Sequence, residues 1–154
     1  MESFNLTAAA TLALLIQYFI FSLFVGAARY KTGVKAPATT GDPFFEATFR
    51  IQHNTLEQLI HVIPALWICS NFLSQTFAVV CAGLFFVGRI LFFIGYRAAP
   101  EKRAPGFIMG FLSSIALILG GAWGVILSLI NSVSYTHLRA HETSLHLVCR
   151  LLLE

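Results

Sequence analysis

Chemically versatile side chains are concentrated in one short segment of a largely apolar sequence. Arginine, glutamine, asparagine, glutamate and two histidines all occur in FRIQHNTLEQLIH, residues 49–61. At about 100° per residue, a helix would bring four of them onto one face. This polar stripe consists of Arg50, Asn54, Glu57 and His61. Gln52 would point to nearly the opposite side of the same helix.

The residue types in the polar stripe are suited to binding a small charged molecule. Arginine binds a carboxylate through two parallel hydrogen bonds, so Arg50 suits an anionic group. Asn54 and Glu57 add an amide and a carboxylate, which could hold an ammonium group. The stripe therefore predicts a site for an anionic or zwitterionic ligand. We interpret His61 as a packing or hydrogen-bonding residue.

A further arginine, Arg89, lies inside the apolar segment 77–96. A charge at membrane depth needs a partner, and Glu57 is the carboxylate predicted to pair with it. Arg89 could also help to bind an anionic ligand, together with Arg29, Arg50 and Arg103. The alternative is a polar network that only holds the helices together. The set contains more donors and charges than helix pairing requires, which favours a ligand site.

The elements that must position these residues are long apolar helices. The 154-residue chain is 57% hydrophobic and 11% charged, with a mean hydropathy of +0.78. A bilayer core about 30 Å thick requires roughly 20 apolar residues in a helix. Four segments predict an all-α, integral membrane four-helix bundle: residues 6–28, 59–73, 77–96 and 106–130. A soluble protein with four buried helices is disfavoured, because too little polar surface would remain to cover it.

The loops between these segments predict the orientation in the membrane. The first loop (29–42) and the third (97–105) are basic, whereas the second (70–76) is uncharged. The excess of lysine and arginine places the first and third loops in the cytoplasm. The membrane would be the bacterial inner membrane, or the endoplasmic reticulum in a eukaryotic host. Because the net charge of +3 is explained by topology, we predict no nucleic-acid partner.

The helix that carries the polar stripe is predicted to begin well before its apolar part. Asp42 can cap it, Pro43 suits its first position, and Glu46 favours its positive end. From residue 43 to about 73 this helix would be roughly 45 Å long, which exceeds the apolar core. Its first half should therefore project toward the cytoplasmic interface. A lipophilic second substrate could reach that place from the bilayer.

The C-terminal residues 132–154 are far more polar than the preceding segment. We interpret them as a translated sequencing adapter and residues 1–131 as the membrane domain; an ordinary surface helix is the alternative. His137, His141 and Glu142 invite a zinc interpretation. Three residues separate Glu142 from His146, however, whereas the zinc-protease motif has two. We therefore predict no metal site and assign this tail no function.

Three parts of the sequence resemble one known family. FRIQHNTLEQ is similar to the R-x-Q-x-N-x-x-E pattern of the MAPEG family, the membrane-associated proteins of eicosanoid and glutathione metabolism. GRILFFIGYRAAPEKRAP resembles the end of that family's third helix and the loop after it. AARYKTGVKAPATTGDPFFEATFR resembles its first loop. The resemblance extends from about residue 10 to 130 and covers all four predicted helices.

The resemblance implies a homotrimer that binds glutathione, as a co-substrate, between neighbouring subunits. Positions matching Arg50, Asn54, Glu57 and Tyr96 line the glutathione site in the family. Positions matching Arg29 and Gln52 reach that site from the adjacent chain, and the position matching Arg103 is the thiol-activating arginine. Arg89 is included because its charge also suits an anionic ligand, so the predicted glutathione-binding residues are Arg29, Arg50, Gln52, Asn54, Glu57, Arg89 and Tyr96.

The chemistry expected of Arg103 is the activation of a thiol. A cysteine thiol has a pKa near 8.5, so it is mostly protonated at pH 7. A guanidinium about 4 Å away contributes roughly 4 kcal/mol at an effective dielectric of 20. Lowering the pKa by two units requires only about 2.7 kcal/mol. We therefore predict a membrane-bound glutathione transferase or peroxidase, which activates glutathione as a thiolate for attack on hydrophobic electrophiles or lipid hydroperoxides.

Two departures from the family pattern bear on this prediction. Leukotriene-synthase-like members carry tyrosines where this chain has Gln58 and Phe92, so Phe92 supplies no hydroxyl to the thiol. Arg103 would then act alone or with Tyr96, which favours a broad transferase over specific leukotriene synthesis. The alternatives are a non-catalytic lipid-binding scaffold of the same fold and a small transporter or purely structural bundle.

Overall fold

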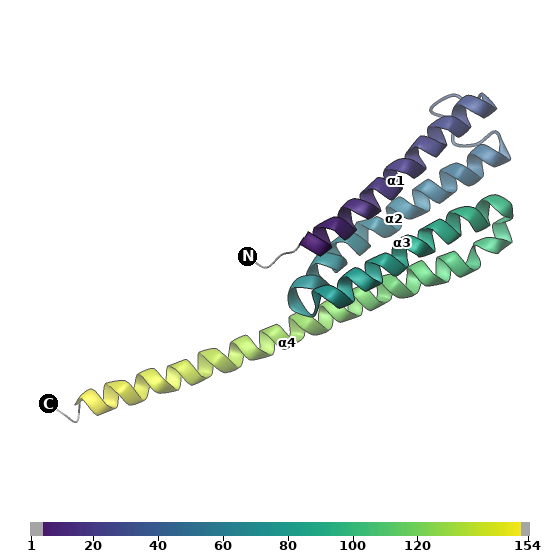
Figure 1. Cartoon of the computed structure of the whole chain (residues 1–154). Coiled ribbons are helices and arrows are strands. Elements are labelled where there is room, and N and C mark those ends of the chain that lie inside the picture. Colours follow the sequence, from purple (N-terminus) through teal and green to yellow (C-terminus); the bar gives the residue numbers. More distant parts are fainter. Residues whose placement is uncertain (1–4, 152–154) are drawn as a thin grey trace.

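The protein, described here by a computed structural model, consists of four long helices and one short connecting helix. The structure describes the backbone of residues 5–151 and the side chains of residues 5–132, except at position 100. In chain order the elements are α1 (Asn5–Thr32), α2 (Pro43–Phe72), α3 (Gln75–Ala98), the 3₁₀ helix η1 (Pro100–Arg103) and α4 (Ala104–Leu151). The helices lie side by side, and α4 continues beyond the other three toward the C-terminus (Figure 1). The predicted four-helix fold is confirmed.

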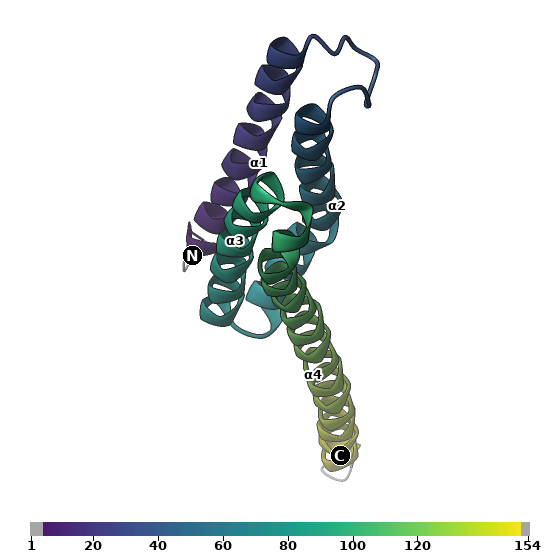
Figure 2. The ribbon, with the colours of Figure 1, turned by 90° about the vertical axis from the view of Figure 1, so that its right-hand side faces the viewer.

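The two basic connections lie at the same end of the bundle. The loop between α1 and α2 is at the end opposite the short α2–α3 turn (Figures 1 and 2). The α3–α4 connection, which includes η1, lies at the same end as the α1–α2 loop (Figure 1). Side chains of residues 133–154 lie outside the described part of the chain. The interpretation of residues 132–154 as foreign sequence therefore stays a prediction.

Within the part of the chain that the structure describes, three helices are long and apolar enough to cross a membrane: Asn5–Thr32, Gln75–Ala98 and Glu101–Ser132. Large apolar side chains on these helices face outward, among them Phe19, Ile94 and Leu119, each about 60% exposed. Outward apolar surface of this extent indicates contact with lipid. The α2 helix does not qualify by itself, because the polar residues of its first half leave an apolar part of only about 14 residues from Leu59 onward. Of the four predicted apolar spans, those in α1, α3 and α4 are confirmed, whereas the predicted segment 59–73 in α2 does not qualify.

The start of α2 is fixed by a side-chain cap, as predicted. Asp42 Oδ1 accepts hydrogen bonds from the backbone amides of Phe44 (2.9 Å) and Phe45 (3.0 Å), and Pro43 occupies the first turn. Glu46 reaches back from the same turn and accepts a hydrogen bond from the amide of Gly41 (2.9 Å). The two bonds to Asp42 pair amide groups that a helix start leaves without partners, and the bond from Gly41 ties the preceding loop to the first turn. They also set the phase of the polar stripe, which begins one turn later.

Replacing Asp42 with alanine should destabilise the protein by about 1 kcal/mol, because two amides of the first turn lose their acceptor. Thermal unfolding in detergent would measure the loss. Asp42→Asn keeps an acceptor oxygen at the same place and should stay close to the wild type. Equal destabilisation by both variants would contradict the assignment of this cap.

Two glycines let α3 approach the connection to α4 closely. A Cβ atom at Gly95 would overlap the backbone carbonyl of Lys102, and one at Gly106 would overlap the backbone of Phe92. Glycine is therefore required at both positions for this approach. The contact at Gly95 packs η1 directly against the last turn of α3. It places the side chain of Arg103 beside that of Tyr96.

Candidate functional site

A small cavity lies where α2, α3 and the beginning of α4 meet. Its volume is about 250 Å³, and its lining includes Arg50 and Asn54 from α2 and Arg103 from η1. The remaining lining residues are Phe92, Tyr96 and Phe107. The Arg103 guanidinium carbon lies 5.2 Å from the centre of the Tyr96 ring. Four of the predicted site residues, from three separate elements, therefore meet in one place.

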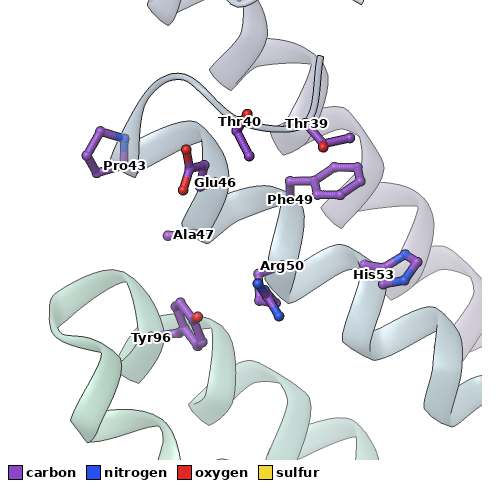
Figure 3. Close-up of a pocket in the computed structure, with 9 residues that line it drawn as sticks. All are labelled: Thr39, Thr40, Pro43, Glu46, Ala47, Phe49, Arg50, His53 and Tyr96. Atoms are coloured by element: carbon purple, nitrogen blue, oxygen red, sulfur yellow. The ribbon is translucent and has the colours of Figure 1, made fainter. Parts of the chain in front are cut away.

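A second cavity adjoins the first and shares Arg50 and Tyr96 with it. Its volume is about 350 Å³, and most of its lining comes from α2 and the loop before it, with Tyr96 facing them from α3 (Figure 3). The other lining residues are Thr39, Thr40, Pro43, Glu46, Ala47, Phe49 and His53. No sequence pattern indicated that Thr39 and Thr40 would belong to the site. Glu46, one turn before Arg50, and His53, flanking the stripe, could have been included on spacing alone.

Arg89 is fully buried, and its predicted pairing with Glu57 is wrong. Its Nη2 donates to Asn54 Oδ1 (3.1 Å) and Thr55 Oγ1 (2.9 Å), and its Nη1 donates to Gln58 Oε1 (3.3 Å). The side chain of Glu57 is instead 58% exposed, and its Oε1 lies 3.4 Å from His53 Nε2. The physical reason is helical phase. Thr55 and Gln58 lie on the buried face of α2, and Glu57 is about 100° away from Gln58.

Gln52 and Arg29 line neither cavity. Gln52 Nε2 donates to the hydroxyl of Tyr18 on α1, so Gln52 does lie on a different face of α2 from Asn54. Arg29 Nη1 donates to the carbonyl of Ala38 (2.8 Å), and its guanidinium lies over the Phe45 ring at 4.5 Å. The single chain therefore brings Arg50, Asn54, Tyr96 and Arg103 together but keeps Arg29, Gln52 and Glu57 apart from them.

The charges of the first cavity are available to a ligand. Within the described residues, neither Arg50 nor Arg103 forms an ion pair with a carboxylate. Two guanidinium groups without a counter-ion, close to one amide, form a site for an anion. Phe92 and Phe107 provide an apolar side to the same cavity.

Comparison with known proteins shows to which family the chain is related. Residues 7–123 match the model of the MAPEG family. The chain belongs to the MAPEG family. An uncharacterized protein of Synechocystis is 41% identical over 121 residues, covering 79% of this chain and 85% of that protein. Family membership confirms the resemblance and accounts for the membrane-spanning helical bundle.

Some of the relatives have names that state an enzymatic function. Microsomal glutathione S-transferase 2 of Homo sapiens is 39% identical over 127 residues, covering 82% of this chain and 86% of that protein. Leukotriene C4 synthase of Bos taurus is 35% identical over 101 residues, covering 65% of this chain and 67% of that protein. At the level of the family, the chain is therefore related to membrane-bound glutathione transferases.

Proposed function

We propose that this protein is a membrane-bound glutathione transferase that activates glutathione as a thiolate for attack on hydrophobic electrophiles. The observation that carries the proposal is the position of Arg103, which lies beside Tyr96 in the cavity that also contains Arg50 and Asn54. The relatives named as a glutathione S-transferase and a leukotriene C4 synthase support it.

In this proposal some residues of the cavity bind glutathione and another stabilises its thiolate. Arg50 and Asn54 bind an anionic group of glutathione, and Arg103 stabilises the negative charge on its sulfur. The thiol proton leaves to solvent, and the thiolate forms a carbon–sulfur bond while the electrophile releases its leaving group. With a lipid hydroperoxide, the thiolate would attack the terminal oxygen and break the O–O bond, which forms the sulfenic acid of glutathione, while the leaving lipid alkoxide takes a proton from water and becomes the alcohol. The thiol of a second glutathione would then attack the sulfur of this sulfenic acid, so that the S–O bond breaks, water leaves and glutathione disulfide forms.

We also propose that the complete site requires a second copy of the chain in a homotrimer. Arg29 and Gln52 line neither cavity, and Glu57 is mostly exposed on the single chain. A neighbouring subunit could bring these residues to the ligand. Because the basic loops lie at the same end of the bundle as the site, we propose that the site faces the cytoplasm.

A non-catalytic, lipid-binding scaffold is the second candidate, and an apolar groove between α2 and α4 favours it. The groove has a volume of about 530 Å³, and its lining is almost entirely apolar, including Ile60, Pro64, Ile118 and Val125. A lipid could occupy this groove without any thiol chemistry. The same groove is compatible with a lipophilic substrate of a transferase, so glutathione binding separates the two functions.

Calorimetric titration of the detergent-purified protein with glutathione tests the proposal. We expect saturable binding, together with conjugation of glutathione to the aromatic electrophile 1-chloro-2,4-dinitrobenzene. Light scattering on the same sample should give the mass of a trimer. A folded trimer that binds no glutathione would overturn the transferase and leave the scaffold.

A further inference from the structure

The buried arginine Arg89 determines how the Asn54 side chain is oriented. Arginine carries five N–H donors and no acceptor. Its hydrogen bond to Asn54, 3.1 Å from Nη2, can therefore be formed only by the amide oxygen. The NH2 end of the amide then points away from Arg89, and Asn54 lines the cavity that contains Arg50 and Arg103. Asn54 consequently offers hydrogen-bond donors to a ligand in that cavity.

Other contacts hold the guanidinium of Arg89 in place. Thr55 Oγ1 accepts from Nη2 (2.9 Å) and also donates to the carbonyl of Ile51 (2.7 Å), so its orientation is fixed as well. Gln58 Oε1 accepts from Nη1 (3.3 Å), and the Phe92 ring covers the guanidinium at 4.2 Å. Three acceptors from little more than one turn of α2 thus bind one side chain of α3. Arg89 has no room to turn away from Asn54.

The partners of Arg89 are all neutral. Among the described residues no carboxylate pairs with it, and its Nε is buried without a hydrogen-bond partner. A buried charge held in this way carries a desolvation cost that the neutral acceptors offset only in part. Helix pairing alone would be served by uncharged side chains at lower cost. The cost of burying this charge is accounted for if the N–H donors of Arg89 orient another side chain of the site.

We propose that Arg89 is a positioning residue that fixes the NH2 group of Asn54 toward the cavity. The oriented amide makes the site select a hydrogen-bond acceptor, which is a carboxylate of glutathione under the proposed function. This proposal rests on that function and changes the place of Arg89 in the site. Arg89 is predicted from the sequence to touch the ligand, whereas its burial makes it act through Asn54.

A double-mutant cycle tests this role, with the dissociation constant of glutathione measured by calorimetry. We expect Arg89→Met to weaken binding about 10-fold in the wild-type background, and less than about 2-fold when Asn54 is already alanine. The turnover number should change little, so the effect appears in KM. Arg89→Lys, which also only donates, should restore most of the binding. Equal weakening by Arg89→Met in both backgrounds would overturn the proposal.

Two further variants keep the test decisive. Thr7→Val breaks the buried hydrogen bond to Ser70 Oγ (2.6 Å), near the other end of α2, and should lower stability without changing glutathione affinity. If Arg89→Met does not fold, Asn54→Asp decides, because it keeps an acceptor for Arg89 and loses the NH2 donor. We expect it to fold as stably as the wild type and to bind glutathione at least about 10-fold more weakly. Wild-type affinity in this variant would refute the role of Arg89.

Failure of this proposal is distinguishable from failure of the proposed function. If the wild type binds no glutathione, the transferase itself is wrong. If the wild type binds glutathione and the effects of Arg89→Met and Asn54→Ala are additive, only the positioning role is lost.

Discussion

Replacing Arg103 with alanine should lower the fraction of bound glutathione present as thiolate roughly 20-fold at pH 7. The guanidinium is expected to lower the pKa of the bound thiol by about two units, from about 8.5 to about 6.5. Without it the thiol returns toward its ordinary pKa. The conjugation rate should fall by about 3- to 20-fold, because a thiolate of higher pKa is the stronger nucleophile and offsets part of the loss.

The thiolate fraction of bound glutathione should depend on pH differently in the wild type and in Arg103→Ala. The lowered pKa keeps the wild-type thiol ionised between about pH 6.5 and 8.5, where the thiol of the variant is still mostly protonated. The difference in thiolate fraction between wild type and Arg103→Ala should therefore be largest inside that window and vanish well below and well above it. Ultraviolet difference absorbance of the bound thiolate would follow the titration. Lys102→Ala removes the charge next to Arg103 in η1, and Lys102 lines neither cavity. The bound thiol in this variant should therefore titrate as in the wild type. Identical titration curves for Arg103→Ala and the wild type would rule out Arg103 as the activating group.

Gly95→Ala should destabilise the protein by about 1–3 kcal/mol and also reduce transferase activity. The added methyl group would overlap the carbonyl of Lys102, and backbone atoms cannot move aside as a flexible side chain can. The repulsion should separate η1 from α3 and move Arg103 away from Tyr96. Thermal unfolding in detergent and the conjugation assay would measure the two effects.

Gly83→Ala is the matched control for this substitution, since both glycines lie inside α3. A Cβ at Gly83 meets no atom within 4 Å, so the only expected effect is the gain of about 0.5–1 kcal/mol from replacing glycine in a helix. Unfolding of both variants at the same temperature would show that the contact with Lys102 does not constrain position 95.

Local rules were sufficient to predict the helices and part of the site. The cap at Asp42 is a short-range feature, and Arg50 and Asn54 share a face because their spacing is close to one helical turn. Helical spacing did not identify the partners of Arg89. Glu57 was predicted as the partner because it carries the opposite charge, whereas the neutral residues Thr55 and Gln58 are the ones that face Arg89 on α3.

The meeting of Arg103 with Tyr96 could not be derived from periodicity. The two residues are separated by the end of α3 and by η1, so no single helix relates them. Their proximity depends on the absence of side chains at Gly95 and Gly106. Gly106 and Gly110 are four residues apart, and small residues at this spacing indicate close packing of helices in lipid. The spacing does not identify the partner helix.

Phe92 separates two charged regions of the protein. One side of its ring covers Arg89 at 4.2 Å, and the same residue lines the cavity with Arg50 and Arg103. An aromatic ring excludes water and has no dipole that can reorient, so it screens an electric field far less than solvent would. An anion in the cavity therefore experiences the field of the buried Arg89 as well as that of the two guanidinium groups beside it. Phe92 therefore keeps Arg89 out of direct contact with the ligand, but the positive charge of Arg89 still attracts an anion in the cavity.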